Sequence, residues 1–137
     1  DASDTEIALR LCLELACEEV ILLGATGTRL DHIWANVQTL SIAKKAGIPA
    51  WIVDAHNRIR LIDGETHLTK QEAFGLYFSL FSLSGPIPGL TITGAKYPLQ
   101  NHTLYPYDSL CVSNQIAEEE TVISFPEGLM VLMETRD

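Results

Sequence analysis

Apolar and polar positions follow two different periods along this chain, and the change of period divides it into two parts. In the first part, two segments with helical spacing are each followed by a short apolar run, Val20–Leu23 and then "AWIVDA". The order helix, strand, helix, strand is the repeating unit of a parallel sheet. We therefore predict an α/β arrangement with parallel strands for residues 1–54.

The first helix is predicted to begin near Ser3, because Ser3 and Glu6 have the spacing of a capping box. Its only polar stripe is narrow and consists of Glu6, Arg10, Glu14 and Glu18. A helix that is apolar around so much of its circumference is buried on more than one side. We expect that a covering partner is missing. Either the chain is the tail of a longer protein, which the lack of an initiator Met favours, or another subunit covers this helix.

The second helix is predicted from about Leu30 to Ala46, with Gly47 as its C-terminal signal and Pro49 as its stop. One helical face carries Leu30, Ile33, Trp34, Val37, Leu40 and Ala43. Trp34 and Trp51 are expected in the core.

From Arg58 onward the pattern is typical of short β-strands. The runs "RIRLID", "FGLYFSLFSL", "LTITGAKYPL", "DSLCVSNQI", "TVISF" and "GLMVLME" are separated by turn residues in Asp63-Gly64, "SGPIPG", "QNH" and "FPEG". We predict an antiparallel sandwich without a long helix in residues 74–135. The expected fold is an α/β remnant in residues 1–56, followed by an all-β antiparallel sandwich domain in residues 57–137.

The composition restricts the possible partners. The 137 residues carry 9 Lys+Arg against 18 Asp+Glu, a formal net charge of −9, which repels nucleic acid and anionic membranes. Cys12, Cys17 and Cys111 show no metal-type spacing, and the first two are most simply small apolar residues. No signal peptide and no run long enough to span a bilayer is evident, so a soluble cytoplasmic protein is expected.

The segment "LLGATGTRLDHIWAN" joins the first strand to the second helix through a glycine-rich turn. Such a turn presents free N–H groups at a helix N-terminus, where Arg29 could clamp an anion beside Asp31 and His32. Two alternatives remain open. The turn resembles a dinucleotide fingerprint with Asp54 as ribose ligand, although Leu30 replaces the third glycine. It could also be a tight connection without a ligand, in which Asp31 only favours the helix dipole.

The motifs "DASDTEIAL", "GATGTRLDHIWANVQTL", "YFSLFSL", "GLTITGAKYPL" and "SLCVSN", in this order, resemble the thiamine pyrophosphokinase family. The family pattern "DxTD" corresponds to Asp1-Ala2-Ser3-Asp4, and Thr28 replaces the second glycine of "GATGGRxDH". The resemblance begins in the middle of the family's α/β domain. It implies an α/β domain that holds ATP and Mg²⁺, a β-sandwich that contacts thiamine, and a homodimer that shares the active site.

The implied reaction transfers pyrophosphate from ATP to the hydroxyl of thiamine and releases AMP. The resemblance implies that Asp4 binds Mg²⁺ or takes the proton of the nucleophile, with Asp1 as a second metal ligand. Arg29 would hold phosphate, and Asp31 would support the metal or orient Arg29. The remaining nucleotide contacts are expected from Thr5, Gly27 and His32. For Asp4, a charge that only favours the helix N-terminus is an open alternative.

Ser113 and Asn114 would hydrogen-bond the aminopyrimidine of thiamine, with Lys96 and Tyr97 nearby and Tyr97 stacking on a ring. Without the resemblance, Ser113 and Asn114 are strand-end residues and Tyr97 a core residue. The histidines His56, His67 and His102 are expected on the surface or in loops.

Three hypotheses remain. They are the C-terminal portion of a thiamine pyrophosphokinase, a fragment of a nicotinamide-dependent oxidoreductase, and a non-catalytic β-module. Under the first, this chain alone is expected to be inactive or nearly so.

Overall fold

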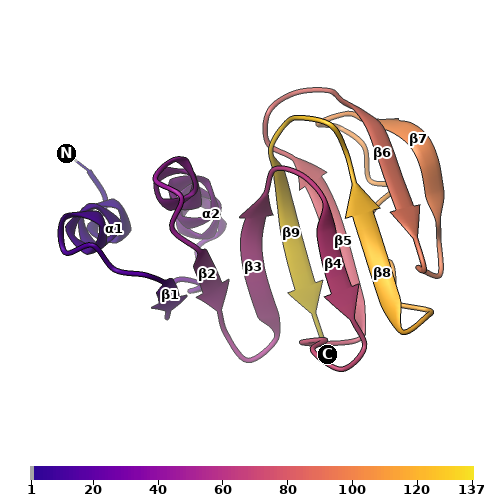
Figure 1. Cartoon of the computed structure of the whole chain (residues 1–137). Coiled ribbons are helices and arrows are strands. Elements are labelled where there is room, and N and C mark those ends of the chain that lie inside the picture. The colour runs from indigo at the N-terminus through magenta and orange to yellow at the C-terminus, as the bar shows by residue number, and fades with distance from the viewer. Residues whose placement is uncertain (1) are drawn as a thin grey trace. The chain divides into compact units, whose positions relative to one another are not determined.

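The computed structural model describes residues 2–137. It contains two compact units, the first ending at Leu61 and the second running Ile62–Asp137. The first unit contains both helices, the first two strands and most of the third (Figure 1): α1 (Asp4–Glu14), β1 (Val20–Leu23), α2 (Leu30–Lys45), β2 (Ala50–Val53) and β3 (Asn57–Ile62).

The strands of the first unit form a mixed arrangement. β1 pairs with β2 in parallel, with Val20 opposite Ala50 and Leu23 opposite Val53. β2 then turns back into β3, which is antiparallel to it. The predicted order of helix, strand, helix and parallel strand is therefore confirmed. Its continuation is a hairpin and not a second crossover helix.

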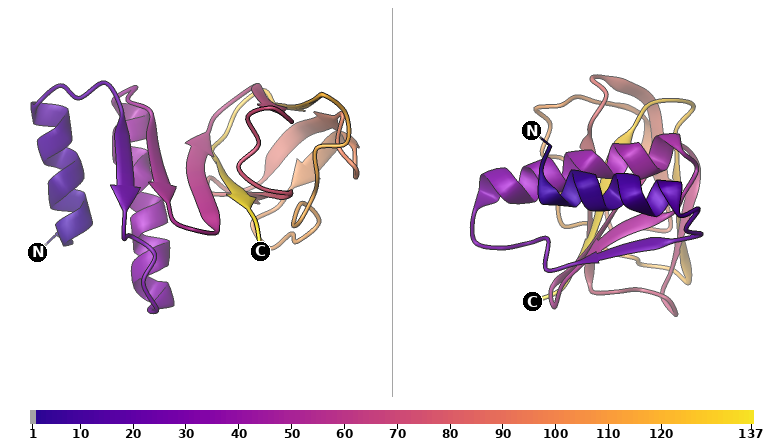
Figure 2. Two further views of the ribbon diagram at one scale, coloured as in Figure 1. Left: turned by 90° about the horizontal axis from the view of Figure 1, so that it is seen from below. Right: turned by 90° about the vertical axis from the view of Figure 1, so that its left-hand side faces the viewer.

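The two helices lie side by side on the same side of the strands. α2 lies over β1 and β2, and α1 lies beside it, beyond the free edge of β1 (Figures 1 and 2). Leu9 of α1, Val20 of β1 and Ala43 of α2 form the centre of their shared core. The prediction that Trp34 is a core residue is wrong, since 44% of it is exposed, whereas Trp51 is half-buried. The buried residues of α2, namely Val37, Leu40 and Ala43, all lie from its middle onward, whereas Leu30 at its start is exposed.

A large apolar surface of the first unit has no cover from the described residues. On α1 only Leu9 is buried, while Ile7, Leu11 and Leu15 are all more than half exposed. On β1, Leu23 is 76% exposed. The expectation that another segment or subunit covers α1 stays a prediction, and these exposures agree with it.

The second unit consists of strands. They are β4 (Thr66–Thr69), β5 (Tyr77–Ser82), β6 (Ile87–Thr93), β7 (Leu99–Leu104), β8 (Glu120–Ser124) and β9 (Met130–Thr135). β4, β8, β6 and β7 form one antiparallel sheet in this order, and β5 pairs antiparallel with β9. Leu80 and Leu132 from the second group share a core with Leu90 and Ile123 from the first. Residues 74–135, all of them described, contain no helix, which confirms the prediction of β structure.

Two details of the β prediction are wrong. The residues "QNH", predicted as a turn, lie inside β7, where irregular pairing with β6 accommodates a positive φ of 49° at Asn101. The run "DSLCVSNQI", predicted as a strand, is a loop that makes only isolated bridges, because Ser113 has a φ of 60° that breaks the extended backbone. Side-chain pattern alone does not reveal either deviation of φ.

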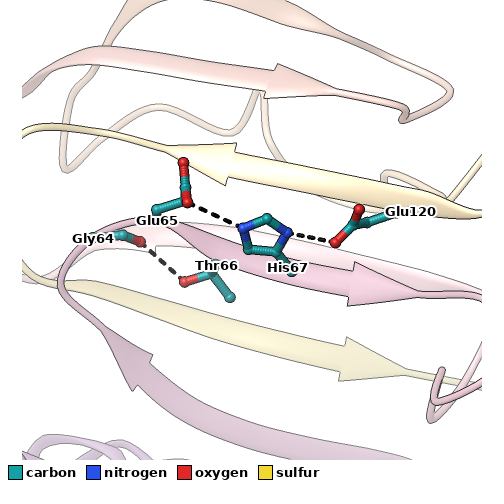
Figure 3. Close-up of polar contacts among 5 residues, drawn as sticks. All are labelled: Gly64, Glu65, Thr66, His67 and Glu120. Atoms are coloured by element: carbon teal, nitrogen blue, oxygen red, sulfur yellow. Dashed lines mark hydrogen bonds and ion pairs between the residues drawn. The ribbon is translucent and has the colours of Figure 1, made fainter.

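His67 is the centre of a small ionic cluster on the surface of β4 and β8 (Figure 3). Its Nε2 lies 3.1 Å from Glu65 Oε2, and its Nδ1 faces Glu120 Oε1. Both ring nitrogens can donate at once only in the imidazolium form. The hydrogen bonds to Glu65 and Glu120 therefore raise the pKa of His67. The His67 side chain is 48% exposed, which confirms the prediction that it is a surface residue.

We expect His67 to titrate above the ordinary histidine pKa of about 6.5. Because the folded-state pKa is raised, the cluster stabilises the fold fully below the unfolded-state pKa. That contribution is lost as the pH rises through the folded-state pKa. An NMR titration of the His67 ring measures this directly, and Glu65→Gln or Glu120→Gln should lower the pKa. Glu18→Gln, an equal charge change in the first unit, is the control; an equal shift in that variant would contradict the assignment.

Candidate functional site

The turn after β1 is held at two points. Gly24 opens it with a φ of 71°, a conformation that favours glycine. Asn36 of α2 donates from Nδ2 to the Ala25 carbonyl oxygen at 2.9 Å, and Thr26 Oγ1 donates to Asp54 Oδ2 at 2.5 Å. The loop is thus tied both to the helix that follows it and to the end of the neighbouring parallel strand.

Asp54 is fully engaged inside the first unit. Besides Thr26, it accepts hydrogen bonds from the backbone N–H groups of His56 (2.8 Å) and Asn57 (2.7 Å). Burial alone would raise the pKa of Asp54, but these hydrogen bonds outweigh it and lower the pKa. A carboxylate already used by the loop and the turn is not the free ribose ligand that the dinucleotide alternative requires.

Two adjoining cavities lie beside this loop. The larger, about 860 Å³, is lined among others by Asp4 and Thr5 from the start of α1 and by His32 and Asn36 from α2. The smaller, about 280 Å³, is lined by residues of the glycine loop together with Arg29, His32 and Asn36. The N-termini of both helices of the first unit therefore border one continuous region.

The electrostatics of this region suit an anion. α1 is capped by Ser3, whose Oγ accepts from the Glu6 N–H at 3.3 Å, but α2 has Arg29 at its N-cap without a side-chain cap hydrogen bond. Arg29 donates to Asp31 Oδ2 at 2.7 Å, and this bond lowers the pKa of Asp31. An arginine and two helix N-termini are groups that bind phosphate oxygens.

Most of the predicted nucleotide and catalytic residues meet here. Asp4, Thr5 and His32 line the larger cavity, and Gly27, Arg29 and His32 line the smaller one. Asp31 lines neither and reaches the site through Arg29. Asp1, predicted as a metal ligand, lies outside the described residues. Within residues 2–137 no three His, Cys, Asp or Glu side chains gather as a metal site.

The four residues predicted to bind thiamine lie together in the second unit. Asn114 Oδ1 accepts from the N–H groups of Tyr97 (3.0 Å) and Gln115 (2.9 Å), and its Nδ2 donates to the Tyr97 carbonyl oxygen at 2.9 Å. Asn114 is 3% exposed. Both lone pairs of its amide oxygen are thus used inside the protein, and one amide N–H remains for a further bond.

Around this buried amide lie exposed groups. Tyr97 is 56% exposed and lies 5.4 Å below the Lys96 ammonium, while Ser113 is exposed with its own N–H bonded to Ser79 Oγ at 2.9 Å. An aromatic face, a cation and a hydroxyl on one surface can stack on and hydrogen-bond a polar heteroaromatic ring. Tyr97 is therefore not the core residue that its β-propensity alone would suggest.

Comparison with known proteins identifies the family of both parts of the chain. The family described as "Thiamin pyrophosphokinase, catalytic domain" matches residues 1–52, and "Thiamin pyrophosphokinase, vitamin B1 binding domain" matches residues 65–130. The thiamine pyrophosphokinase of Bacillus subtilis (strain 168) is 33% identical over 138 residues, covering 100% of this chain and 64% of that protein. The chain belongs to the thiamine pyrophosphokinase family.

Solved structures of the family have the same fold. The crystal structure of the Bacillus subtilis thiamine pyrophosphokinase matches with a TM-score of 0.92 at 32% identity, covering all of this chain and 64% of that one. The enzyme of Geobacillus thermodenitrificans matches with a TM-score of 0.87 at 35% identity, over 63% of its length. This chain thus spans somewhat less than two thirds of these thiamine pyrophosphokinases.

Membership of the thiamine pyrophosphokinase family was predicted from the sequence. Asn36 was not singled out as a lining residue of the candidate site, and Asp54 was considered only as a ribose ligand. Asn36 borders both cavities, and Asp54 holds the loop through Thr26. Asn36 shares a helical face with Leu40 and Ala43, so a polar residue on an apolar stripe was the available signal.

Neither described helix is long and apolar enough to cross a membrane.

We expect Asn114→Ala to destabilise the second unit by about 1–3 kcal/mol, because it leaves part-buried backbone groups at Tyr97 and Gln115 without their hydrogen-bond partner. Urea unfolding measures the change. Ser113→Ala is the matched control and should stay within about 0.5 kcal/mol of the unsubstituted chain, since its side chain is exposed. Equal stabilities of the two variants would show that the Asn114 amide contributes no net stabilisation.

Proposed function

We propose that the protein transfers pyrophosphate from ATP to the hydroxyl of thiamine, giving thiamine diphosphate and AMP. The observation that carries this proposal is the cavity region where two helix N-termini meet Arg29 and Asp4. It offers groups for a polyphosphate on a chain whose overall charge is −9. In the reaction, the thiamine hydroxyl oxygen attacks the β-phosphorus of ATP and AMP leaves.

The first unit would act mainly by positioning and charge neutralisation. Arg29 holds phosphate oxygens and Asp31 fixes the guanidinium, as their 2.7 Å bond already does. Thr5, Gly27 and His32 contact the nucleotide. Asp4 binds Mg²⁺ or accepts the proton of the attacking hydroxyl.

Mg²⁺ is the proposed cofactor, and the residues present are compatible with it. Mg²⁺ is typically held by one or two carboxylates together with substrate phosphates. Asp4 is the carboxylate that lines the larger cavity within residues 2–137, and Asp1 is the second proposed ligand. Bound Mg²⁺ would neutralise phosphate charge.

For thiamine, Tyr97 stacks on a ring, while Ser113 and the remaining amide N–H of Asn114 hydrogen-bond the aminopyrimidine, with Lys96 beside them. The bonds of Asn114 to Tyr97 support a second role, in which Asn114 holds the stacking residue in place. The dinucleotide alternative is not favoured, because Asp54 is engaged by the loop and β2 continues into a hairpin.

The finer architecture is proposed on the same basis. The first unit is part of a larger ATP-binding α/β domain, and the strands of the second form a thiamine-binding sandwich. A homodimer in the cytoplasm, with the site shared between subunits, would account for the exposed apolar residues. These include Ile7 (57% exposed), Leu11 (52%) and Ile21 (53%).

Thermal unfolding tests the function. Thiamine or ATP with Mg²⁺ should raise the melting temperature of this chain, since a ligand at 100 times its Kd stabilises by about 2.7 kcal/mol. NADPH and buffer alone are the control arms. A rise with NADPH and none with thiamine or ATP would overturn the proposal in favour of an oxidoreductase.

Turnover of this chain alone is expected to be far below about 1 per second. Asp4 is the only described carboxylate in the cavity lining, which is few ligands for a metal-dependent phosphoryl transfer. Chromatographic assay of AMP and thiamine diphosphate checks this. Rapid AMP formation that depends on thiamine would show that the residues of this chain suffice.

Arg29→Lys in the active protein should lower kcat/KM, because a point charge cannot replace a bidentate guanidinium. Losing one charge-assisted hydrogen bond predicts about 1.5–3 kcal/mol, or roughly 10- to 150-fold. Arg10→Lys is the matched control, since Arg10 pairs with Glu6 on the surface of α1. Unchanged kinetics in Arg29→Lys, with folding intact, would reduce Arg29 to a surface residue.

A further inference from the structure

The C-terminus of α1 ends in a Schellman motif formed around two cysteines. Ala16 has a φ of 54°, and its N–H donates to the Leu13 carbonyl oxygen at 3.1 Å. The Cys17 N–H donates back to the Cys12 carbonyl oxygen, also at 3.1 Å. This pair of hydrogen bonds defines the motif. A side-chain contact between the two outermost residues, which here are Cys12 and Cys17, often accompanies it.

The outer positions here are both thiols. Cys12 and Cys17 are half-buried, and both pack against the core cluster around Leu9, Val20 and Ala43. Burial, and after it the neighbouring Cys17 thiol, raise the pKa of Cys12. The backbones of the two cysteines are joined by the Cys17–Cys12 hydrogen bond, and both side chains pack on the same core cluster. A disulfide needs such closely spaced residues.

We propose that Cys12 and Cys17 form a reversible intrachain disulfide, a redox modification site at the end of α1 opposite the cavity. The oxidant is a small-molecule disulfide such as glutathione disulfide. One cysteine thiolate attacks it and expels one glutathione thiolate, which leaves a mixed disulfide. The second cysteine then attacks the mixed disulfide, closes the ring and expels the second glutathione, so two protein thiols are oxidised and one disulfide is reduced to two thiols.

The surroundings of Cys12 do not stabilise its thiolate. Strongly oxidising dithiol pairs are those whose reduced state is stabilised as a thiolate. At Cys12, burial and the neighbouring thiol work against the thiolate, so the reduced state gains nothing of that kind. The same effect makes the attack slow near neutral pH, because only the thiolate reacts.

Closure would restrict the last turn of α1. That turn contains Leu15, whose N–H bonds to the Leu11 carbonyl oxygen at 3.0 Å, and it leads into β1. The opposite end of α1 supplies Ser3, Asp4 and Thr5 to the larger cavity. A Cys12–Cys17 disulfide would therefore restrain the helix that forms one wall of the larger cavity, although neither cysteine lines that cavity.

The third cysteine provides an internal control. Cys111 is buried among the strands of the second unit, and burial raises its pKa to about 11. Because Cys111 is protonated near neutral pH and buried, it reacts slowly with an oxidant in solution. Oxidation should therefore be selective for the pair in the first unit.

The test uses the whole chain, incubated with glutathione disulfide at mildly alkaline pH and digested with trypsin after the free thiols are blocked. Cys12 and Cys17 fall in one peptide, residues 11–29, because no Lys or Arg lies between Arg10 and Arg29. Mass spectrometry should show this peptide lighter by two hydrogen atoms and free of glutathione. Cys17→Ser should instead keep glutathione on Cys12, and Cys111→Ser should behave as the unsubstituted chain.

Urea-unfolded chain is the reference for the effect of folding. We expect folding to raise the equilibrium constant for closure at least about tenfold, which corresponds to about 30 mV for a two-electron couple. Amide exchange at Ala16 and Cys17 should slow in the oxidised form. Two glutathiones on the peptide, unreacted thiols in the folded chain, or closure no more favourable than in urea would each overturn the proposal, and none of these readouts depends on catalysis.

Discussion

The parallel pairing of β1 with β2 is the constraint on which the candidate site depends. Two parallel strands need a crossover between them, and here that crossover is α2. Their carboxyl ends then meet at one edge of the sheet, so the glycine loop after β1 and Asp54 after β2 become neighbours. The Thr26–Asp54 hydrogen bond, 2.5 Å long, joins these two ends directly. The N-terminus of α2 necessarily starts at the same edge.

The placement of helix N-termini explains how an acidic chain can offer an anion site. With a net charge of −9, the overall field opposes ATP. The cavities use local sources of positive potential instead, namely the starts of α1 and α2 and the Arg29 guanidinium. Asp31 accepts a hydrogen bond from Arg29 at 2.7 Å, and Arg29 lines the smaller cavity.

In the second unit a buried amide has the corresponding organising role. The segment around Ser113 is irregular, and its backbone joins β5 at two separate points. These are the bridge between Phe78 and Asn114 and the hydrogen bond from the Leu80 N–H to the Cys111 carbonyl oxygen at 3.0 Å. The Asn114 side chain supplies the missing order by fixing Tyr97 and Gln115. An irregular loop whose interior is fully hydrogen-bonded can present polar groups outward with little mobility. The exposed side chains of Tyr97 and Ser113 are therefore carried by backbone that is hydrogen-bonded to Asn114 and Ser79.

The sequence by itself determined the elements of the first part, including the bounds of β1, the parallel pairing and the family, because these follow from local periodicity and contiguous motifs. Tertiary structure alone decided the rest. Trp34 is exposed because no described residue of its unit covers the N-terminal part of α2. The "QNH" residues enter β7 because bulged pairing accepts Asn101. The roles of Asp54 and Asn114 were equally hidden. Asp54 accepts a hydrogen bond from Thr26, which is 28 residues away in sequence, and Asn114 accepts one from Tyr97, which is 17 residues away. Only folding brings such partners within hydrogen-bonding range.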